Sequence, residues 1–387
     1  MLATTAPWLP ALPPFLLASV VCMVAVPLSM LAARRIGRGA VDHPDADRRI
    51  HTAPTPRLGG LALYVGFASA VAAFGGSIGA RWQIVAISGV VTVAMAVDDI
   101  LGLPWYAKLL IETGAGVLAF VVGAAITFVA VPGGDGANVF NLAWMSLPVT
   151  LIWFVGLQNS INFLDGVDGV AAGVVAIVAG VLLLAAINRL GPTDNVQSDV
   201  IVLSGALMGC CLGFLVFNFA PARTFMGDSG SHFLGVALGM ITVLGVAKLA
   251  VALSLLVPLV ALGLPIGDTA FAIIRRRRAG RGIAYADTGH LHHRLLDIGF
   301  TPRETAVAFY LATGILGCVG LALFGHRRIL LVAVGLLALT LIGLVWRNLR
   351  REPAPAVSPA EEKPAGYVTL PGRPATPTRV RHGGEVD

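Results

Sequence analysis

The sequence contains little charge. Only 12% of its 387 residues are Asp, Glu, Lys or Arg, about half of the roughly 25% that is usual in soluble domains. Hydrophobic residues make up 56% of the chain. This composition argues strongly against a water-soluble enzyme.

Cysteine is scarce as well, and none of it forms a recognisable pattern. Cys22, Cys210, Cys211 and Cys318 all fall inside uncharged stretches, where cysteine usually packs as a small hydrophobic side chain. Neither a disulfide framework nor a thiolate metal site is indicated. The first 33 residues also lack a basic leader, so we interpret them as a membrane span and not as a secretory signal.

In place of charge, the sequence has long apolar runs. Eleven stretches of 16 residues or more contain no charged residue, and about 20 helical residues cross the core of a bilayer. We therefore predict an all-α integral membrane protein, a polytopic bundle of about eleven transmembrane helices. The stretches are 1–33, 58–80, 82–97, 113–134, 136–164, 169–188, 200–222, 229–247, 249–267, 305–326 and 329–346.

The basic residues indicate how these spans are oriented. If the N-terminus lies outside, the inner loops and the tail hold 22 Lys and Arg residues and the outer loops hold 5. This asymmetry follows the positive-inside rule, so we expect the N-terminus outside and the C-terminus in the cytoplasm. The net charge of +6 is then mostly a topology signal, and nucleic acid is not an expected partner.

Two regions differ in composition. Residues 1–350 form the predicted membrane domain, whereas 351–387 are rich in proline and in scattered charges. Such a tail cannot bury enough apolar surface to fold, so we predict that it is disordered and cytoplasmic.

Six aspartates fall at the predicted cytoplasmic ends of the spans. Acids at helix ends are common, but the outer loops contain no comparable motifs, and the inner set lies beside asparagines and glycines. Such a one-sided group of carboxylates is typical of a site that holds a cation and a polar substrate. The six are Asp98, Asp99, Asp165, Asp168, Asp228 and Asp268.

Three segments combine these acids with other functional groups. Asp98 and Asp99 are followed by Lys108. Two adjacent carboxylates at one site can hold Mg²⁺, or one of them can act as a base. The segment 159–169, NSINFLDGVDG, places Asn159 and Asn162 on one helix face before Asp165 and Asp168. The segment 225–231, FMGDSGS, opens a span with small residues around Asp228, and free backbone N–H groups at a helix start favour phosphate. The plain alternatives are Asp-Gly turns and a helix cap.

Two cytoplasmic loops add basic residues and histidines. The loop 275–303 contains Gly289-His290-Leu291-His292-His293-Arg294, and the loop after the first span contains His51 and Arg57. A zinc site is the alternative for the histidines, but no Cys or acid stands at the spacing that structural zinc prefers. The simpler interpretation is that these side chains donate hydrogen bonds to a nucleotide diphosphate.

With these five segments in order, residues 40–300 resemble the polyprenyl-phosphate N-acetylhexosamine-1-phosphate transferases. The resemblance implies transfer of a sugar 1-phosphate from a UDP-sugar to undecaprenyl phosphate, with Mg²⁺ or Mn²⁺, giving a lipid-linked diphosphate sugar and UMP. The histidine run and Gly102-Leu103 resemble the branch that uses UDP-N-acetylglucosamine (UDP-GlcNAc). One departure is Glu112, where the family usually has Gln.

The resemblance also implies roles. Asp228 and Asn162 would hold the metal, Lys108 would contact phosphate, and Asp98, with Asp99 second, would deprotonate or orient the lipid phosphate. Direct attack by the lipid phosphate and a covalent aspartyl intermediate both remain open, and direct attack is favoured. Substrate-binding residues would be His51, Arg57, Asn159, Asn162, Asp165, Asp168, His290, His292, His293 and Arg294.

The alternative from another class is a secondary transporter or lipid flippase. Transporter acids usually lie near the bilayer midplane, whereas these lie at one predicted surface, so we favour the transferase. Expected partners are UDP-GlcNAc, undecaprenyl phosphate and membrane lipids, with a homodimer left open. The expected location is the bacterial inner membrane, with the site on its cytoplasmic face.

Overall fold

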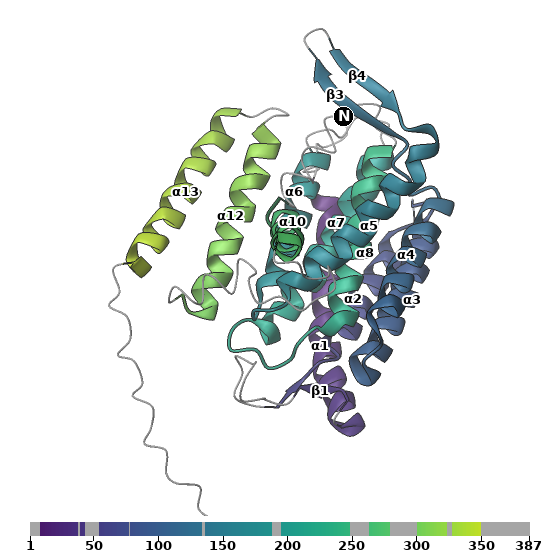
Figure 1. Ribbon diagram of the computed structural model, residues 1–387, viewed down its shortest axis with the longest axis vertical. Coiled ribbons are helices and arrows are strands. Elements are labelled where there is room, and N and C mark those ends of the chain that lie inside the picture. The colour runs from purple at the N-terminus through teal and green to yellow at the C-terminus, as the bar shows by residue number, and fades with distance from the viewer. Residues whose placement is uncertain are drawn as a thin grey trace, which may run out of the picture. The chain divides into compact units, whose positions relative to one another are not determined.

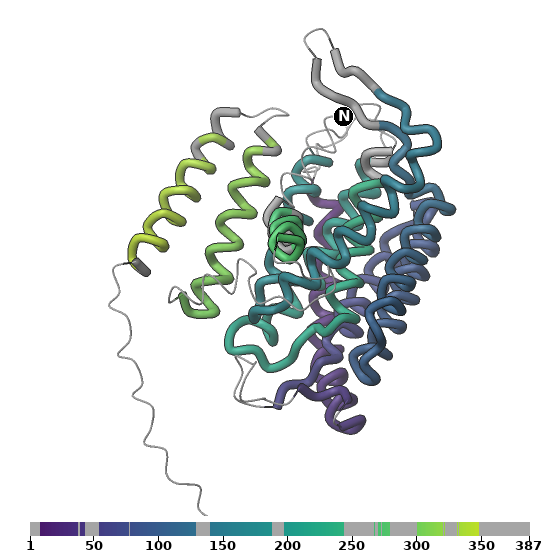
Figure 2. The backbone as a smooth tube through the Cα atoms, viewed as in Figure 1, coloured from purple at the N-terminus to yellow at the C-terminus, as the bar shows by residue number. Residues whose placement is uncertain are grey.

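The structure, a computed structural model, describes residues 8–37, 39–42, 54–76, 78–133, 136–187, 195–247, 263–278, 300–322 and 327–349 (Figure 2). Some of the predicted site residues lie outside these ranges: His51, His290, His292, His293 and Arg294. The predicted tail, 351–387, lies outside them too, so the proposed division of the chain stays a prediction.

Helices dominate the described residues (Figure 1). They are α1 (Leu12–Ile36), α2 (Gly59–Phe74), α3 (Arg81–Leu101), α4 (Trp105–Val121), α5 (Ser146–Leu164), α6 (Val170–Ile187), α7 (Asn195–Asn218), α8 (Gly227–Ala247), α10 (Gly263–Arg278), α12 (Pro302–Ala322) and α13 (Arg327–Leu349), with 3-10 turns η1 (Leu9–Ala11) and η2 (Ala143–Met145).

The predominance of helices agrees with the predicted all-α membrane class, and two short antiparallel strand pairs that the sequence analysis did not predict lie between them. β1 (Val41–Asp42) pairs with β2 (Thr55–Pro56), and β3 (Phe128–Gly133) pairs with β4 (Gly136–Asn141). The uncharged stretches 113–134 and 136–164 therefore each contain one strand of the second hairpin beside the helical residues of α4 and α5. Absence of charge does not distinguish a strand from a helix, whereas the Val, Phe, Pro and Gly residues of β3 favour a strand and a turn.

The fold is that of a multi-pass membrane protein. Five helical segments in the described ranges are long and apolar enough to cross a bilayer: Leu9–Ile36, Arg81–Leu101, Ala143–Leu164, Val170–Ile187 and Gln197–Asn218. On α1, Val24 and Leu28 are 61% and 62% exposed. Apolar side chains exposed in this way face lipid in a bilayer, where they carry no cost of hydration.

Small residues bring the central helices close together. On α7, a glycine recurs every fourth residue at 205, 209 and 213, and a Cβ at any of them would collide with backbone atoms of residues 11–19. The hydroxyl of Ser19 donates to the carbonyl oxygen of Gly209 at 2.9 Å. This is the small-residue packing that membrane helices use for close approach.

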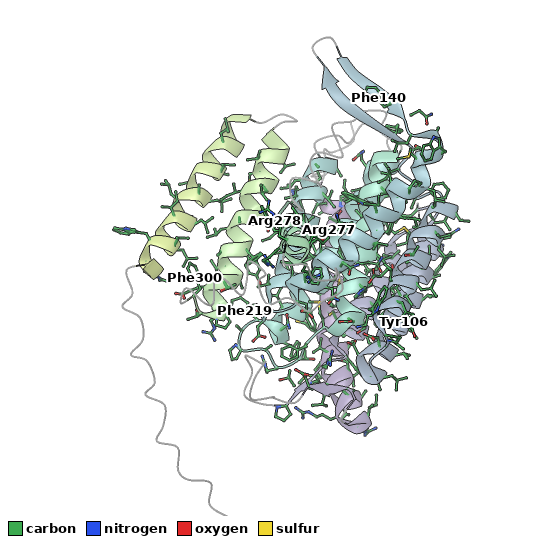
Figure 3. The ribbon with its side chains drawn as sticks, viewed as in Figure 1. Tyr106, Phe140, Phe219, Arg277, Arg278 and Phe300 are labelled. Carbon is green, nitrogen blue, oxygen red and sulfur yellow. The ribbon has the colours of Figure 1, made fainter. Side chains whose placement is uncertain are left out.

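The first turn of α4 carries aromatic residues typical of a membrane surface. Trp105 and Tyr106 are 64% and 63% exposed, and Figure 3 shows Tyr106 on the outer side of the bundle. Trp and Tyr gather at the level of the lipid headgroups. Lys108 follows two residues later, so the N-terminal end of α4 has the composition of an interfacial segment.

Candidate active site

The acidic pair stands where α3 ends. Gly102 adopts a left-handed conformation with φ of 70°, and its N–H donates to the carbonyl oxygen of Asp98 at 2.8 Å. Glycine tolerates this conformation because it has no Cβ. Pro104 then precedes α4. The helix therefore stops directly after the two acids and leaves both, each 4% exposed, in its last turn.

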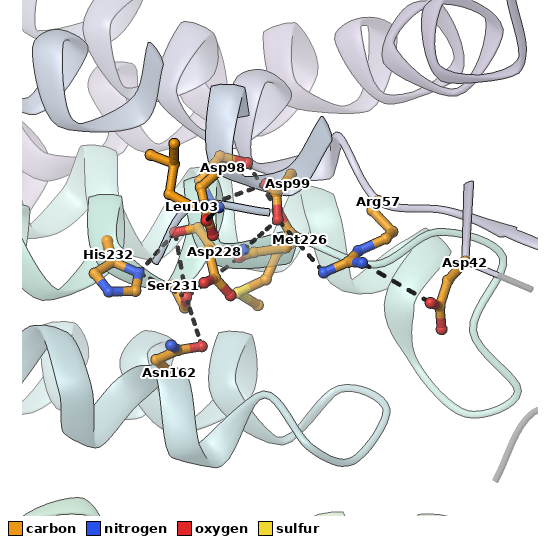
Figure 4. Close-up of polar contacts among 12 residues, drawn as sticks. Asp42, Arg57, Asp98, Asp99, Leu103, Asn162, Met226, Asp228, Ser231 and His232 are labelled. Atoms are coloured by element: carbon orange, nitrogen blue, oxygen red, sulfur yellow. Dashed lines mark hydrogen bonds and ion pairs between the residues drawn. The ribbon is translucent and has the colours of Figure 1, made fainter. Parts of the chain in front are cut away.

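Asp99 closes the N-terminal end of another helix. Its two carboxylate oxygens accept hydrogen bonds from the backbone N–H groups of Asp228 and Ser229, at 2.8 and 3.0 Å (Figure 4). The first N–H groups of a helix have no partner within that helix, and a carboxylate there is also favoured by the helix dipole. Asp99 thus fixes the start of α8, and with it Asp228, against α3.

Asp98 belongs to a different contact. Its Oδ2 lies 2.6 Å from Nζ of Lys108, which in turn lies 2.6 Å from Oδ2 of Asp228. The other oxygen, Oδ1, accepts a hydrogen bond from the N–H of Leu103 at 2.6 Å. The ammonium group of Lys108 therefore bridges the carboxylates of Asp98 and Asp228, which lie 130 residues apart in the sequence.

Arg57 lies on the other side of Asp99. Its guanidinium is 3.8 Å from Asp99 and 3.9 Å from Asp42. The neighbouring backbone is tied to the loop before α8, because the N–H of Phe225 donates to the carbonyl oxygen of Pro56 at 2.8 Å. The structure therefore brings the segment around Arg57 against the 225–231 segment.

The 159–169 segment reaches the same region from α5. Oδ1 of Asn162 accepts a hydrogen bond from the hydroxyl of Ser231 at 3.3 Å, and Nδ2 of Asn159 donates to Glu112 at 2.6 Å. Asp168 accepts a hydrogen bond from the N–H of Ala222 at 2.8 Å. Asp168 therefore ties the α5–α6 turn to the loop between α7 and α8.

Asp165, which follows the end of α5, lies near other acids of the cluster, and their charges affect its pKa. Burial raises the pKa of its carboxyl well above the usual range, and the negative charges of Asp228, Asp99 and Asp168 raise it further. An acid-rich site of this kind favours an added cation. The sequence-based grouping of acids from three segments is thus matched by their proximity.

Two residues of this region were not predicted as site residues. Glu112 and His232 are 3% and 1% exposed and lie 3.0 Å apart. Their positions differ by 120 residues, so no local spacing indicates the contact. The only sequence signal was the acid at position 112 where the family usually has Gln.

The oxygen donors of the site would suit a Mg²⁺ ion that substrates help to hold. Within the described ranges, no group of three or more His, Cys, Asp or Glu side chains is placed to hold a metal ion by itself. Mg²⁺ is usually bound by one or two carboxylates together with substrate phosphates and water. Asp228, whose side chain is 18% exposed, and Asn162 offer oxygen atoms of this type.

Replacing Gly227 by Ala is expected to disturb the start of α8. Gly227 has φ of 68°, and an added Cβ would lie 2.5 and 2.6 Å from the carboxylate oxygens of Asp99. The strained conformation alone costs about 1–2 kcal/mol. We expect a lower melting temperature in detergent and loss of activity.

The matched control is Gly114→Ala on α4, where an added Cβ meets nothing within 4 Å. There, alanine is expected to be neutral or stabilising by about 0.5–1 kcal/mol, since it favours the helix. A Gly227→Ala protein with normal melting temperature and activity would show that Asp99 does not need this geometry.

The apolar helices and the partly buried cluster of acids and lysine define a multi-pass membrane enzyme. The model of glycosyl transferase family 4 matches residues 82–246, a range that runs from α3 through α8. A relative from Bacillus subtilis, a probable undecaprenyl-phosphate N-acetylglucosaminyl 1-phosphate transferase, is 34% identical over 300 residues, which cover 77% of this chain and 80% of the relative. The chain belongs to glycosyl transferase family 4.

Two further relatives extend the comparison. A decaprenyl-phosphate N-acetylglucosaminephosphotransferase from Mycolicibacterium smegmatis is 35% identical over 350 residues, 83% of this chain and 85% of the relative. A phospho-N-acetylmuramoyl-pentapeptide-transferase from a Synechococcus strain is 34% identical over 306 residues, 75% of this chain and 85% of the relative. The resemblance inferred from the motifs is confirmed at the level of the family.

Proposed function

We propose that this protein transfers N-acetylglucosamine 1-phosphate from UDP-GlcNAc to undecaprenyl phosphate. The products would be undecaprenyl-diphosphate-GlcNAc and UMP, at the start of cell-envelope polysaccharide synthesis. The observation that supports this most is the Asp98–Lys108–Asp228 contact at the ends of apolar helices. It offers one cation and two carboxylates, groups that suit a reaction between a lipid phosphate and a nucleotide sugar.

The reaction would be a direct displacement. An oxygen of the acceptor phosphate forms a bond to the sugar-bearing phosphorus of UDP-GlcNAc, and the bond from that phosphorus to the bridging oxygen breaks, releasing UMP. Lys108 would hold and orient phosphate oxygens, and Asp98 would accept a proton from the acceptor phosphate or orient it. Mg²⁺, held by Asp228 and Asn162, would neutralise diphosphate charge when bound.

The proposed topology is about eleven spans in the bacterial inner membrane, with the N-terminus outside and the site at the cytoplasmic face. It is supported by the split of 22 to 5 basic residues and by the gathering of the motifs where α3 and α5 end and α8 begins. The relatives described above are named as transferases, so the transporter alternative is set aside.

The test is UMP release by purified full-length protein in detergent. We expect UMP with undecaprenyl phosphate, UDP-GlcNAc and Mg²⁺, no UMP after chelation with EDTA, and recovery when Mg²⁺ or Mn²⁺ is added back. Running a panel of UDP-N-acetylhexosamines and both undecaprenyl and decaprenyl phosphate identifies the preferred donor and acceptor. No UMP from folded protein with any of these pairs would refute the proposed reaction.

The histidines of the loop 275–303 are expected to act on the donor. Replacing His292 and His293 together by Ala should raise the KM for the UDP-sugar roughly 10- to 100-fold, since a hydrogen bond to a charged group contributes about 1.5–3 kcal/mol. The KM for undecaprenyl phosphate should change much less. Equal increases in both KM values would contradict a role in donor binding.

A further inference from the structure

Glu112 and His232 form a buried polar pair that contacts the acid cluster at the backbone of Asp228. Oε1 of Glu112, on α4, is 3.0 Å from Nε2 of His232, on α8, and both side chains are almost fully buried. The mechanism proposed above uses neither residue. Taking an acid and an imidazole out of water is costly unless their hydrogen bonds are satisfied, so the partners of the pair indicate its role.

On one side the pair contacts Asp228. Nδ1 of His232 lies 2.9 Å from the carbonyl oxygen of Asp228, one helical turn earlier. A carbonyl oxygen can only accept, so this contact places a hydrogen on Nδ1. One further proton is then shared between Nε2 of His232 and Oε1 of Glu112. The pair is therefore neutral as a whole, whichever of the two atoms carries that proton.

On the other side the pair contacts α5. Oε2 of Glu112 accepts a hydrogen bond from Nδ2 of Asn159 at 2.6 Å, and the same Nδ2 donates to the carbonyl oxygen of Val155 at 2.9 Å. With both amide hydrogens donated to the protein, Asn159 can meet a ligand only through its amide oxygen. By accepting from Nδ2, Glu112 leaves the amide oxygen of Asn159 as the group that can contact a ligand.

We propose that Glu112 and His232 are positioning residues. By linking α4 to α5 and α8, the pair fixes the first turn of α8 relative to the side-chain amide of Asn159. The pair acts on the reaction through Asp228, whose backbone it holds from one side while Asp99 holds it from the other. The proposal deepens the proposed transferase function and rests on it.

The decisive variant is the double replacement Glu112→Leu with His232→Leu in the full-length protein. Removing both partners leaves no buried charge without its partner, and such double replacements are often close to neutral for stability. We expect a melting temperature near that of the wild type and a kcat lower by roughly 10- to 100-fold, as for other groups that orient metal ligands.

Glu112→Gln tests the same idea by rescue. A glutamine has the same shape, its amide oxygen can accept from Asn159, and its amide hydrogen can donate to Nε2 of His232. We expect a kcat close to that of the wild type. A large loss of kcat in Glu112→Gln would contradict a role that depends on hydrogen-bond geometry.

A matched control removes another polar contact between α5 and α8. Nε1 of Trp153 donates to Oγ1 of Thr242 at 3.1 Å, at a position about 21 Å along α8 from Asp228 at 1.5 Å per residue. Thr242→Val is nearly isosteric, so we expect unchanged kcat.

Equal kcat in the wild type and the double Leu variant would overturn the proposal. If the wild type itself released no UMP, the proposed function would fail, and Mn²⁺ affinity measured by electron paramagnetic resonance would decide the positioning role separately. Binding at least roughly 10-fold weaker in the double variant, with Thr242→Val unchanged, would support it. Equal Mn²⁺ affinity in all three proteins would overturn it.

Discussion

Asp228→Asn is expected to lower the rate of UMP release by roughly 10³-fold, the upper range for removing one preorganised electrostatic group. The replacement exchanges one oxygen for nitrogen and removes the charge that faces Lys108 and, in our proposal, Mg²⁺. The backbone N–H that donates to Asp99 and the carbonyl that meets His232 are kept. We therefore expect a normal melting temperature, with kcat measured at saturating Mg²⁺.

Glu304→Gln is the matched control for this exchange. Glu304 lies on α12, where it pairs with Arg347 at 2.7 Å, and it takes no part in the described cluster. The same change from acid to amide there should leave UMP release unaltered. Near-normal activity of Asp228→Asn would refute its assignment as a metal ligand.

Lys108→Met should produce the second large effect, a fall in kcat of roughly 10²- to 10³-fold. Nζ lies 2.6 Å from one oxygen of Asp98 and 2.6 Å from one of Asp228. Without the ammonium group, two carboxylates would face each other, and like charges at about 4–6 Å disfavour the ionised forms. Both the cation for phosphate and the charge state of the acids would be lost.

Lys108→Arg separates charge from shape. Arginine keeps the positive charge, but its planar fork cannot place one compact ammonium between two oxygens, so we expect activity between that of Lys108→Met and the wild type. A Lys108→Met protein with normal kcat and only a raised KM would show that Lys108 contributes to binding and not to the transfer step.

Much of the fold was predictable because membrane spans depend on local composition. The uncharged stretches around α1, α3, α6 and α7 correspond to helices that are long and apolar enough to cross a bilayer. The exception is the region between α4 and α5, where β3 and β4 form a hairpin. Lack of charge there is compatible with either structure, and strand pairing depends on two segments together.

The grouping of acids was predictable for a related reason. Charged residues at the ends of apolar spans lie at a membrane surface, and consecutive spans alternate in direction, so Asp98, Asp165 and Asp228 were expected at one face. The contacts from Asp99 to the backbone of Asp228 and from Lys108 to both Asp98 and Asp228 agree with that expectation. Their catalytic roles stay predictions.

The different contacts that Asp98 and Asp99 make were not predictable from the sequence. Asp98 and Asp99 are adjacent, and sequence reasoning ranked them by motif alone. The structure directs Asp99 to two backbone N–H groups of α8 and Asp98 to Lys108. Neighbouring residues in a helix point about 100° apart, so they meet different elements, and which elements those are depends on helix packing.

Composition and ordered motifs alone determine the membrane class, the family and the grouping of the acids, because transfer of apolar segments into lipid and helix breaking at Gly and Pro are local properties of the chain. Only the tertiary structure decides that Asp99 closes α8, that Lys108 bridges Asp98 and Asp228, and that Glu112 meets His232. These contacts join residues more than 100 positions apart in most cases. A hydrogen bond requires atoms within about 3 Å, and such distances are set by the packing of whole helices.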